Sequence, residues 1–350
     1  IIAGGPGAWQ LALKPKIARA LGIDCIVEGE GEKIISEIVR KAIDGEPLPF
    51  HFLVEESNVP SADEIPPIRK PSNNGIIEIS RGSLREGDTS VRHIPIEKIA
   101  IELKVNMNSG LKEVLLQSKD VPLYGSTTLE PNPEAFKKVH SLVINKGNEI
   151  SWTQGELTSI YLAEKKYHLI SWLREKIETH QEMWGAQVPV ITGSYKLANF
   201  VMPERIQPFP PSKWPHIVEE CFSILNESKM VPIATFILGL PEETPDDLIR
   251  TLELLDKLRK YRSTLIPFLF ISPDKIRGEN WYSRIDMSDL HKEILLKMFY
   301  HSLYWGEKLV KGYLNYPMFA PLRAVLRGIT SYVKVKAILK VRKFMLKGEV

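Results

Sequence analysis

Short apolar runs alternate with stretches of helical periodicity along most of this chain. Such runs predict buried strands, and apolar residues spaced three or four apart predict helices. Between residues 75 and 272 we predict six strand positions, at 76–80, 113–117, weakly near Ile150, 188–192, 233–238 and 265–272. The predicted helices cover 96–106, 133–143, 162–177, 214–225 and 246–258. This alternation predicts a parallel sheet covered by helices, in a curved or barrel-like arrangement whose ligands bind at the carboxyl ends of the strands.

The regions on either side of this repeat differ from it and from each other. Residues 1–45 contain two short predicted strands, at 1–3 and 24–27, with helical spacing at 17–21 and 32–43, which is half of a doubly wound α/β domain. Residues 46–74 hold six prolines and little periodicity, so we expect a linker there. We predict one barrel-like domain over 75–285. Residues 286–350 are predicted to be helical, with a break near Pro317 and Pro321.

The composition is that of an ordinary globular protein. The chain has 350 residues, of which 43% are hydrophobic and 25% charged, which is enough for roughly two domains and excludes bulk disorder. The longest apolar runs are strand-sized and too short to span a membrane. Because the first residue is Ile and the chain opens inside an apolar strand, we expect further sequence upstream.

Positive charge is concentrated at the carboxyl end. Residues 322–350 carry eight Lys and Arg side chains against Glu349 alone. Because the whole chain carries +3 and this segment +7, the rest carries −4. Helical spacing places the basic residues beside an apolar side formed by Leu326, Ile329, Val333, Ala337 and Phe344. Such a helix either binds an anionic membrane surface or RNA, or packs its apolar side on the domain and solvates its charges.

The chain contains only two cysteines, Cys25 and Cys221, in predicted strand and helix segments. They cannot form a thiolate zinc site or an iron–sulfur site, which need three or four ligands. We expect two buried thiols without a disulfide and a reducing, cytoplasmic compartment. The eight histidines show no metal-ligand spacing, and no nucleophilic triad, phosphate-binding loop or pair of glycosidase-type carboxylates is recognisable.

Two glycine-rich turns follow the first two predicted strands. They are Gly4-Gly5-Pro6-Gly7 and Glu28-Gly29-Glu30-Gly31-Glu32. Glycine at such a turn either allows the tight geometry or lets a ligand approach the backbone. The acidic series would repel a phosphate, and Glu30 or Glu32 is expected to cap the following helix.

Taken together, these turns and the segment Asp44-Gly45-Glu46-Pro47 resemble the final part of the cobalamin-binding domain that precedes many radical S-adenosylmethionine (SAM) enzymes. The resemblance implies a partial Rossmann-like domain with Gly4, Gly5, Gly7, Gly29 and Gly31 at a cobalamin-like site. The half of that domain with the cobalt-ligating histidine loop is absent from this sequence.

The resemblance continues at residues 77–83 (Ile-Glu-Ile-Ser-Arg-Gly-Ser), which are similar to the first barrel strand of the radical SAM superfamily. In that family the next loop carries CxxxCxxC, whose three thiolates hold a [4Fe–4S] cluster that binds and reductively cleaves SAM. The corresponding positions in this chain are Ser83, Gly87 and Ser90. Because serine is a poor ligand for such iron and glycine is none, we predict that the cluster and SAM cleavage are absent.

Further segments resemble the family's SAM-contacting motifs. The resemblance implies a partial (βα)6 TIM-type barrel and a SAM-like site formed by Tyr124, Gly125, Thr192, Gly193, Ser194, Gly239 and Glu242. The most specific of these segments, residues 236–244, is also a sound turn into a helix, with Thr244 as N-cap and Pro245 at the first helical position.

These observations lead to two functional hypotheses. The first is a radical SAM family protein of the cobalamin-binding class, without a functional cluster, that retains SAM binding. The second is a noncatalytic structural or regulatory protein that docks through its basic 322–350 helix to an anionic membrane, an RNA or an active paralogue. The sequence identifies neither a substrate nor a reaction.

Overall fold

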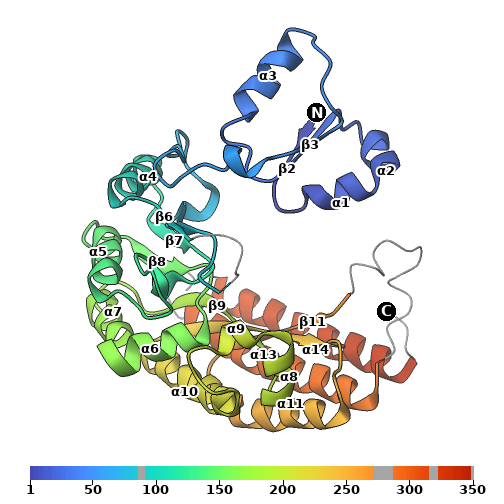
Figure 1. Cartoon of the computed structure of the whole chain (residues 1–350). Coiled ribbons are helices and arrows are strands. Elements are labelled where there is room, and N and C mark those ends of the chain that lie inside the picture. The colour runs from blue at the N-terminus through green and yellow to red at the C-terminus, as the bar shows by residue number, and fades with distance from the viewer. Residues whose placement is uncertain (86–90, 272–286, 315–321, 348–350) are drawn as a thin grey trace.

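The computed structural model describes residues 1–85, 91–271, 287–314 and 322–347 (Figure 1). It is a mixed α/β structure with several parallel sheets, as the alternation of strands and helices predicted. An N-terminal part stands beside a larger body whose helices lie around its strands (Figure 1). No helix within the described ranges is long and apolar enough to cross a membrane.

The N-terminal part is built on a three-stranded parallel sheet in the order β1-β2-β3. Its elements are β1 (Ile2–Ala3), α1 (Ala8–Leu13), α2 (Pro15–Ala20), β2 (Cys25–Glu28), α3 (Ile35–Ile43) and β3 (His51–Leu53). The expected linker over 46–74 is therefore wrong for residues 51–53, which pair with β2 in register. Two small buried clusters, one around Val27 and one around Ile26, hold this part together.

The larger body contains two three-stranded parallel sheets, in the orders β4-β7-β8 and β11-β10-β9. A parallel bridge between Gln154 and Gln187 connects them, so β8 lies beside β9. The strands are β4 (Ile76–Glu78), β7 (Glu113–Gln117), β8 (Glu149–Trp152), β9 (Trp184–Ile191), β10 (Met230–Leu238) and β11 (Thr264–Leu269). Within the described ranges no pairing joins β4 to β11, so these strands do not form a closed barrel.

A short antiparallel pair departs from the parallel pattern. It consists of β5 (Ser80–Arg81) and β6 (Arg92–His93), and it comes directly after β4. The sequence analysis expected one strand over 76–80 and did not expect β6. This pair places two arginines at the edge nearest the N-terminal part.

Helices separate successive strands of the body. They are α4 (Ile96–Asn108), α5 (Pro133–Ile144), α6 (Leu157–Tyr167), α7 (Leu169–Ile177), α8 (Tyr195–Val201), α9 (Pro203–Ile206), α10 (Trp214–Glu227) and α11 (Pro245–Leu258). The single helix expected over 162–177 is instead broken at His168, which adopts a left-handed backbone with φ of 51°. One continuous buried cluster runs through this body and includes Trp152, Phe136, Trp214 and Phe222.

Two long helices complete the described chain, α13 (Asp289–Tyr313) and α14 (Arg323–Lys347). The helical prediction for 286–350 is thus confirmed over both helices, whereas the expected break near Pro317 and Pro321 lies outside the described residues. Helix α13 packs against β11 and α11, and α14 contacts α13.

Candidate functional site

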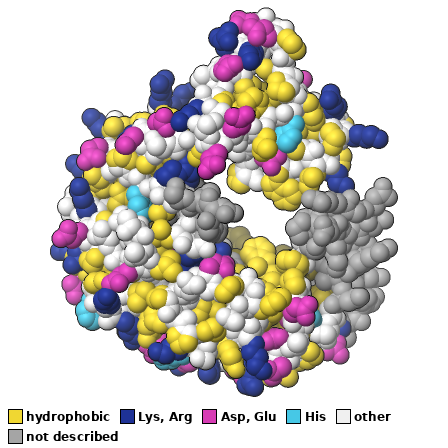
Figure 2. Space-filling view, in the orientation of Figure 1, with side chains coloured by type: hydrophobic (Ala, Val, Ile, Leu, Met, Phe, Trp, Pro, Cys, Tyr) yellow, Lys and Arg dark blue, Asp and Glu magenta, His cyan; other side chains and the backbone are white. Residues whose placement is uncertain are grey.

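A cavity of about 1120 Å³ lies between the N-terminal part and the larger body (Figure 2). Its N-terminal wall follows the ends of β1 and β2, and its opposite wall follows the ends of β4, β7 and β8, the short strand β5 and Gln187 in the middle of β9. The carboxyl ends of parallel strands therefore face the cavity from both sides. This is the edge at which α/β proteins place their ligand sites, and the volume is slightly above the usual range for small-molecule sites, roughly 300–1,000 Å³.

The two walls differ in chemistry. On the N-terminal side the apolar side chains of Trp9, Val27 and Ile35 line the cavity. The other side presents hydroxyl, amide and amine groups, on Ser80, Gln117, Ser118, Lys119, Thr153, Gln154 and Gln187. Four carboxylates also line the cavity, those of Glu28, Glu30 and Glu32 on the N-terminal side and that of Glu78 on the other. The site can thus hold a ligand that combines an apolar face with many hydrogen-bonding groups.

Four of the five glycines predicted for a cobalamin-like site line this cavity. They are Gly4, Gly5, Gly29 and Gly31, whereas Gly7 is not among its described lining residues. Gly5 and Gly29 have positive φ, so both turns adopt a backbone that other residues rarely take. The structure therefore places these turns at a cavity without showing what fills it.

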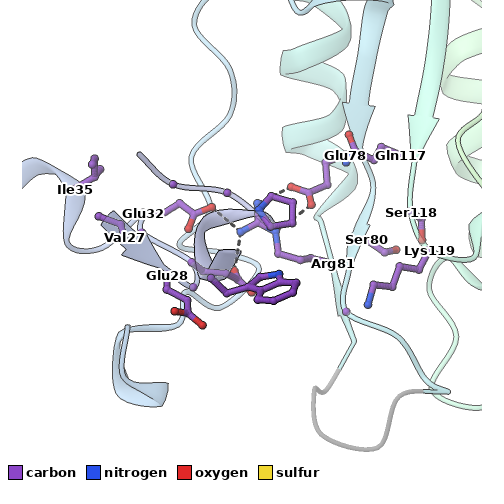
Figure 3. A pocket seen from close by; sticks show the side chains of 18 of the residues that line it. Val27, Glu28, Glu32, Ile35, Glu78, Ser80, Arg81, Gln117, Ser118 and Lys119 are labelled. Atoms are coloured by element: carbon purple, nitrogen blue, oxygen red, sulfur yellow. Dashed lines mark hydrogen bonds and ion pairs between the residues drawn. The ribbon is translucent and has the colours of Figure 1, made fainter. Parts of the chain in front are cut away.

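Arg81 connects the two walls. Its Nη1 lies 2.7 Å from Glu30 Oε2 and 2.6 Å from Glu32 Oε1, and its Nη2 lies 2.7 Å from Glu78 Oε2 (Figure 3). Arg92 donates a second hydrogen bond to Glu30, with Nη1 and Oε2 3.0 Å apart. Two arginines of the β5–β6 pair thus hold the acidic turn that follows β2.

These hydrogen bonds and ion pairs determine the pKa values of the charged side chains in this group. Burial alone would raise the pKa of Glu30, but hydrogen bonds from Arg92 and Arg81 outweigh it and lower that pKa. The hydrogen bond to Glu78, followed by those to Glu30 and Glu32, raises the pKa of Arg81 despite partial burial.

The prediction that Glu30 or Glu32 caps the following helix is wrong, because Ile34 is the N-cap of α3 and no side-chain hydrogen bond caps that helix.

Of the residues predicted for a SAM-like site, Tyr124 and Gly125 lie just beyond the end of β7 and do not line the cavity. The Tyr124 hydroxyl donates to the Ile94 carbonyl over 2.9 Å, and burial raises its pKa to about 12. Gly125 has φ of 73°, and a Cβ atom there would lie 2.4 Å from Ala135 Cβ. Packing alone therefore accounts for both residues.

Thr192, Gly193 and Ser194 follow β9 and connect it to α11 and α8. The Gly193 amide donates to Thr251 Oγ1 over 3.0 Å, and Thr192 Oγ1 lies 3.3 Å from the same atom. The Ser194 hydroxyl donates to Asp247 Oδ1 over 2.5 Å and caps α8. The polar groups of this segment are thus used within the protein.

Gly239 and Glu242 lie in the turn between β10 and α11, away from the described cavity lining. The Gly239 amide donates to Glu243 Oε2 over 2.8 Å, and both Gly239 and Glu242 have positive φ. Thr244 caps α11 in a capping box with Asp247, and Pro245 takes the first helical position. The structural interpretation of this turn is confirmed, whereas its role toward SAM stays a prediction.

We expect Gly193→Ala to lower the free energy of unfolding by about 2 kcal/mol, because overpacking costs of order 1–3 kcal/mol. The added Cβ would lie 2.6 Å from Thr251 Cα and 2.8 Å from the Arg250 carbonyl oxygen, where α11 packs on this turn. Urea unfolding measures the effect. Gly7→Ala is the control, because neither glycine has a positive φ and no atom lies within 4 Å of the Cβ added at Gly7. Equal losses in both variants would contradict the packing explanation.

Ser83, the first predicted cluster-ligand position, stands beside a buried arginine. Its Oγ accepts a hydrogen bond from the Arg85 amide over 3.1 Å. The Arg85 guanidinium donates to the carbonyls of Glu204 and Gln207, over 2.9 and 3.0 Å, and to Ser159 Oγ over 2.9 Å. The other two ligand positions, Gly87 and Ser90, lie outside the described residues.

Two buried carboxyl groups surround this guanidinium. Asp120 Oδ2 lies 3.6 Å from Arg85 Nε and accepts a hydrogen bond from Ser159 over 2.5 Å. Burial raises the pKa of Asp120, although Arg85 and Ser159 oppose the rise. Burial also raises the pKa of Glu156 to about 7, against the opposing charge of Arg205, whose Nη1 lies 2.6 Å from Glu156 Oε1. A small cavity of about 20 Å³ lies beside Ser83, Arg85, Glu156 and Arg205.

This donor set does not fit an iron–sulfur cluster. Ser83 offers one hydroxyl, and a positively charged guanidinium follows it. Cys25 and Cys221 are fully buried, as expected, in the N-terminal sheet and in α10, and burial raises the pKa of both thiols. Across the parts of the chain that the structure describes, no three His, Cys, Asp or Glu side chains are grouped to hold a metal ion.

Sequence reasoning missed the residues that organise this region, namely Arg81, Arg85, Arg92, Asp120 and Glu156. Arg85 and Ser159 are separated by 74 residues, and Arg81 and Glu30 by 51. The available signal was the presence of Arg81 and Arg85 around Gly82, in the segment where Ser83, Gly87 and Ser90 stand in place of cysteines. In comparisons with known proteins, no family model and no curated protein matches this chain.

Proposed function

We propose that this chain is a member of the radical SAM superfamily, of the class with a cobalamin-binding domain, that has lost cluster chemistry and binds an organic ligand in the cavity between its two parts. The observation that carries the proposal is the cavity itself, which is lined by the strand ends of both parts. A protein that only packs its elements together has no need of such a cavity.

The strand order supports the superfamily assignment. Adjacent β8 and β9 give the parallel order β4, β7, β8, β9, β10, β11, with helices between the strands, and this order supports the proposal of a partial (βα)6 barrel. The parallel β1-β2-β3 sheet, with its two glycine turns, supports the proposal of a partial Rossmann-like domain. The order of the motifs along the chain agrees with both.

The cavity chemistry suits a large ligand with amide side chains, such as a corrinoid. Trp9, Val27 and Ile35 would pack against its apolar face, while Gln117, Gln154 and Gln187 would bond its amide groups. None of the described residues lining the cavity is a histidine, so a cobalt atom would receive no imidazole from them.

Cluster chemistry is left out of the proposal because Ser83, Gly87 and Ser90 supply no thiolate and the Arg85 guanidinium lies close to Ser83. The residues predicted to contact SAM are engaged in internal hydrogen bonds and packing. Binding of SAM is therefore measured separately from binding of a corrinoid.

Calorimetry with hydroxocobalamin, SAM and S-adenosylhomocysteine tests the proposal. We expect saturable corrinoid binding that Gln117→Trp weakens by about tenfold or more, because an indole would take up space in the cavity. Lys138→Trp, at an exposed position on α5, serves as the control. Binding of SAM alone would favour the SAM-retaining hypothesis. Failure of all three ligands to bind would contradict the ligand-binding proposal, and a four-iron EPR signal after anaerobic reconstitution would contradict the loss of the cluster.

A further inference from the structure

Helix α14 presents an apolar face to solvent. Exposed fractions lie between 54% and 65% for Leu322, Val325, Ile329, Tyr332, Val333, Val335 and Leu339. Another side of the helix packs on α13, where Lys334 Nζ lies 2.6 Å from Glu307 Oε2. Packing on the domain was one of the two predicted roles for the apolar side, and it is wrong for Ile329 and Val333. Exposed apolar faces usually mark interaction sites, and α13 does not bury this one.

Lysines continue the same face. From Ile329 the positions Val333, Lys336 and Lys340 follow at steps of four, three and four residues, which places them in one row along a helix. Lys336 and Lys340 are exposed, and Lys336 Nζ lies 5.9 Å from the centre of the Tyr332 ring. The row therefore changes from apolar to basic toward the carboxyl end of α14.

The charge distribution selects an anionic partner. Residues 322–350 carry +7, while the rest of the chain carries −4. A purely apolar partner would leave these lysines without counter-charges, whereas an anionic surface attracts them and repels the rest of the molecule. The charge distribution therefore also orients the protein, with α14 toward the anionic surface.

The kind of apolar side chain on α14 distinguishes a membrane partner from an RNA partner. Proteins that read RNA sequence stack its bases on aromatic rings or guanidinium planes. Apart from Tyr332, the exposed apolar side chains that the structure describes on α14, up to Leu339, are aliphatic, and aliphatic groups suit the acyl boundary of a bilayer. Lysine stems can extend from that boundary so that the ammonium groups reach the headgroups.

We infer that α14 lies flat on an anionic lipid surface, with Ile329 and Val333 at the acyl boundary and Lys336 and Lys340 at the headgroups. The helix lies on the membrane rather than across it, because it is not apolar enough to span one. This inference does not depend on what the cavity binds.

Co-sedimentation of the full chain with vesicles tests the charge component. We expect binding to phosphatidylcholine vesicles that contain phosphatidylserine, and little binding to pure phosphatidylcholine. Lys336→Gln with Lys340→Gln should weaken partitioning by about 25-fold at low salt, since each lysine near such a surface contributes about 1 kcal/mol. The matched control is Lys146→Gln with Lys176→Gln, which removes the same charge from exposed positions on the larger body.

A second pair of variants tests the apolar component. Ile329→Ser with Val333→Ser should weaken vesicle binding by about tenfold, whereas Ile329→Leu with Val333→Leu should preserve it. Circular dichroism checks that each variant remains folded. Equal binding to both kinds of vesicle, no sedimentation, an RNA complex that competes with vesicles for α14, or a dimer that dissociates in the serine variant would each overturn the inference.

Discussion

Replacing Arg85 with methionine is expected to lower the free energy of unfolding by about 3–5 kcal/mol, the usual cost of removing one partner from a buried ion pair. The Arg85 side chain is 3% exposed and Asp120 is 9% exposed, so water cannot take the place of the guanidinium. The Glu204 and Gln207 carbonyls and Ser159 would lose donors as well. Urea unfolding monitored by tryptophan fluorescence measures the change.

A double-mutant cycle distinguishes loss of the ion pair from loss of volume. Asp120→Asn in the Arg85→Met background should restore part of the lost stability, because it removes the buried negative charge that Arg85 otherwise balances. Arg259→Met, an exposed arginine just beyond α11, is the control and should change stability by less than about 0.5 kcal/mol. A loss below about 1 kcal/mol in Arg85→Met would show that the network does not stabilise the fold.

The second large effect that we expect is a loss of stability at low pH, caused by His140. His140 is fully buried, its Nδ1 donates to the Phe136 carbonyl over 2.7 Å, and its Nε2 accepts from Trp152 Nε1 over 3.0 Å. This arrangement requires the neutral ring, because a protonated Nε2 would face the indole N–H. Burial lowers the pKa of His140 to about 4.

The direction in which the free energy of unfolding changes with pH follows from the number of protons bound in the folded and unfolded states. The unfolded chain binds a proton at His140 near pH 6.5 and the native state only near pH 4, so this stability is complete above pH 6.5 and lost as the pH falls toward 4. The loss amounts to about 3 kcal/mol at 1.4 kcal/mol per pH unit. Glu156 acts oppositely, because its pKa is raised to about 7 and its contribution declines as the pH rises from 4.5 to 7.

Comparison with a variant isolates the histidine, because Glu156 and the other carboxyl groups titrate in both proteins. The drop in unfolding free energy between pH 6.5 and pH 4 should be about 3 kcal/mol smaller in His140→Asn than in the original chain. The control is His180→Asn, an exposed position after α7, and should leave the drop unchanged. Parallel pH profiles for the original chain and His140→Asn would contradict a neutral buried ring.

Local patterns in the sequence were enough to predict most elements of the larger body. Strand β7 occupies its predicted range, and β10 and α11 begin and end within a few residues of theirs, because buried strands and amphipathic helices leave their period in the sequence. Strand β3 was missed because it is three residues long and follows a proline-rich segment. Nothing at His168 indicated a left-handed residue, since histidine is ordinary within helices.

The candidate site was predictable only in part. Glycines after buried strands indicated where the cavity wall lies, because parallel strands bring their carboxyl ends to one edge. The pairing of Arg81 with Glu30 and of Arg85 with Asp120 depends on how distant segments meet, which a single sequence does not encode locally. For the same reason the acidic turn was assigned to capping rather than to these arginines.

The burial of both thiols makes the chain convenient for spectroscopy. Cys25 and Cys221 are inaccessible in the folded state, and their raised pKa values keep them as unreactive thiols. A maleimide label would therefore attach selectively to cysteines introduced at exposed positions, with both native residues left in place. Labels at Arg40 on α3 and Lys146 after α5 would then report, by pulsed EPR, the width of the cavity in solution as ligands or salt are added.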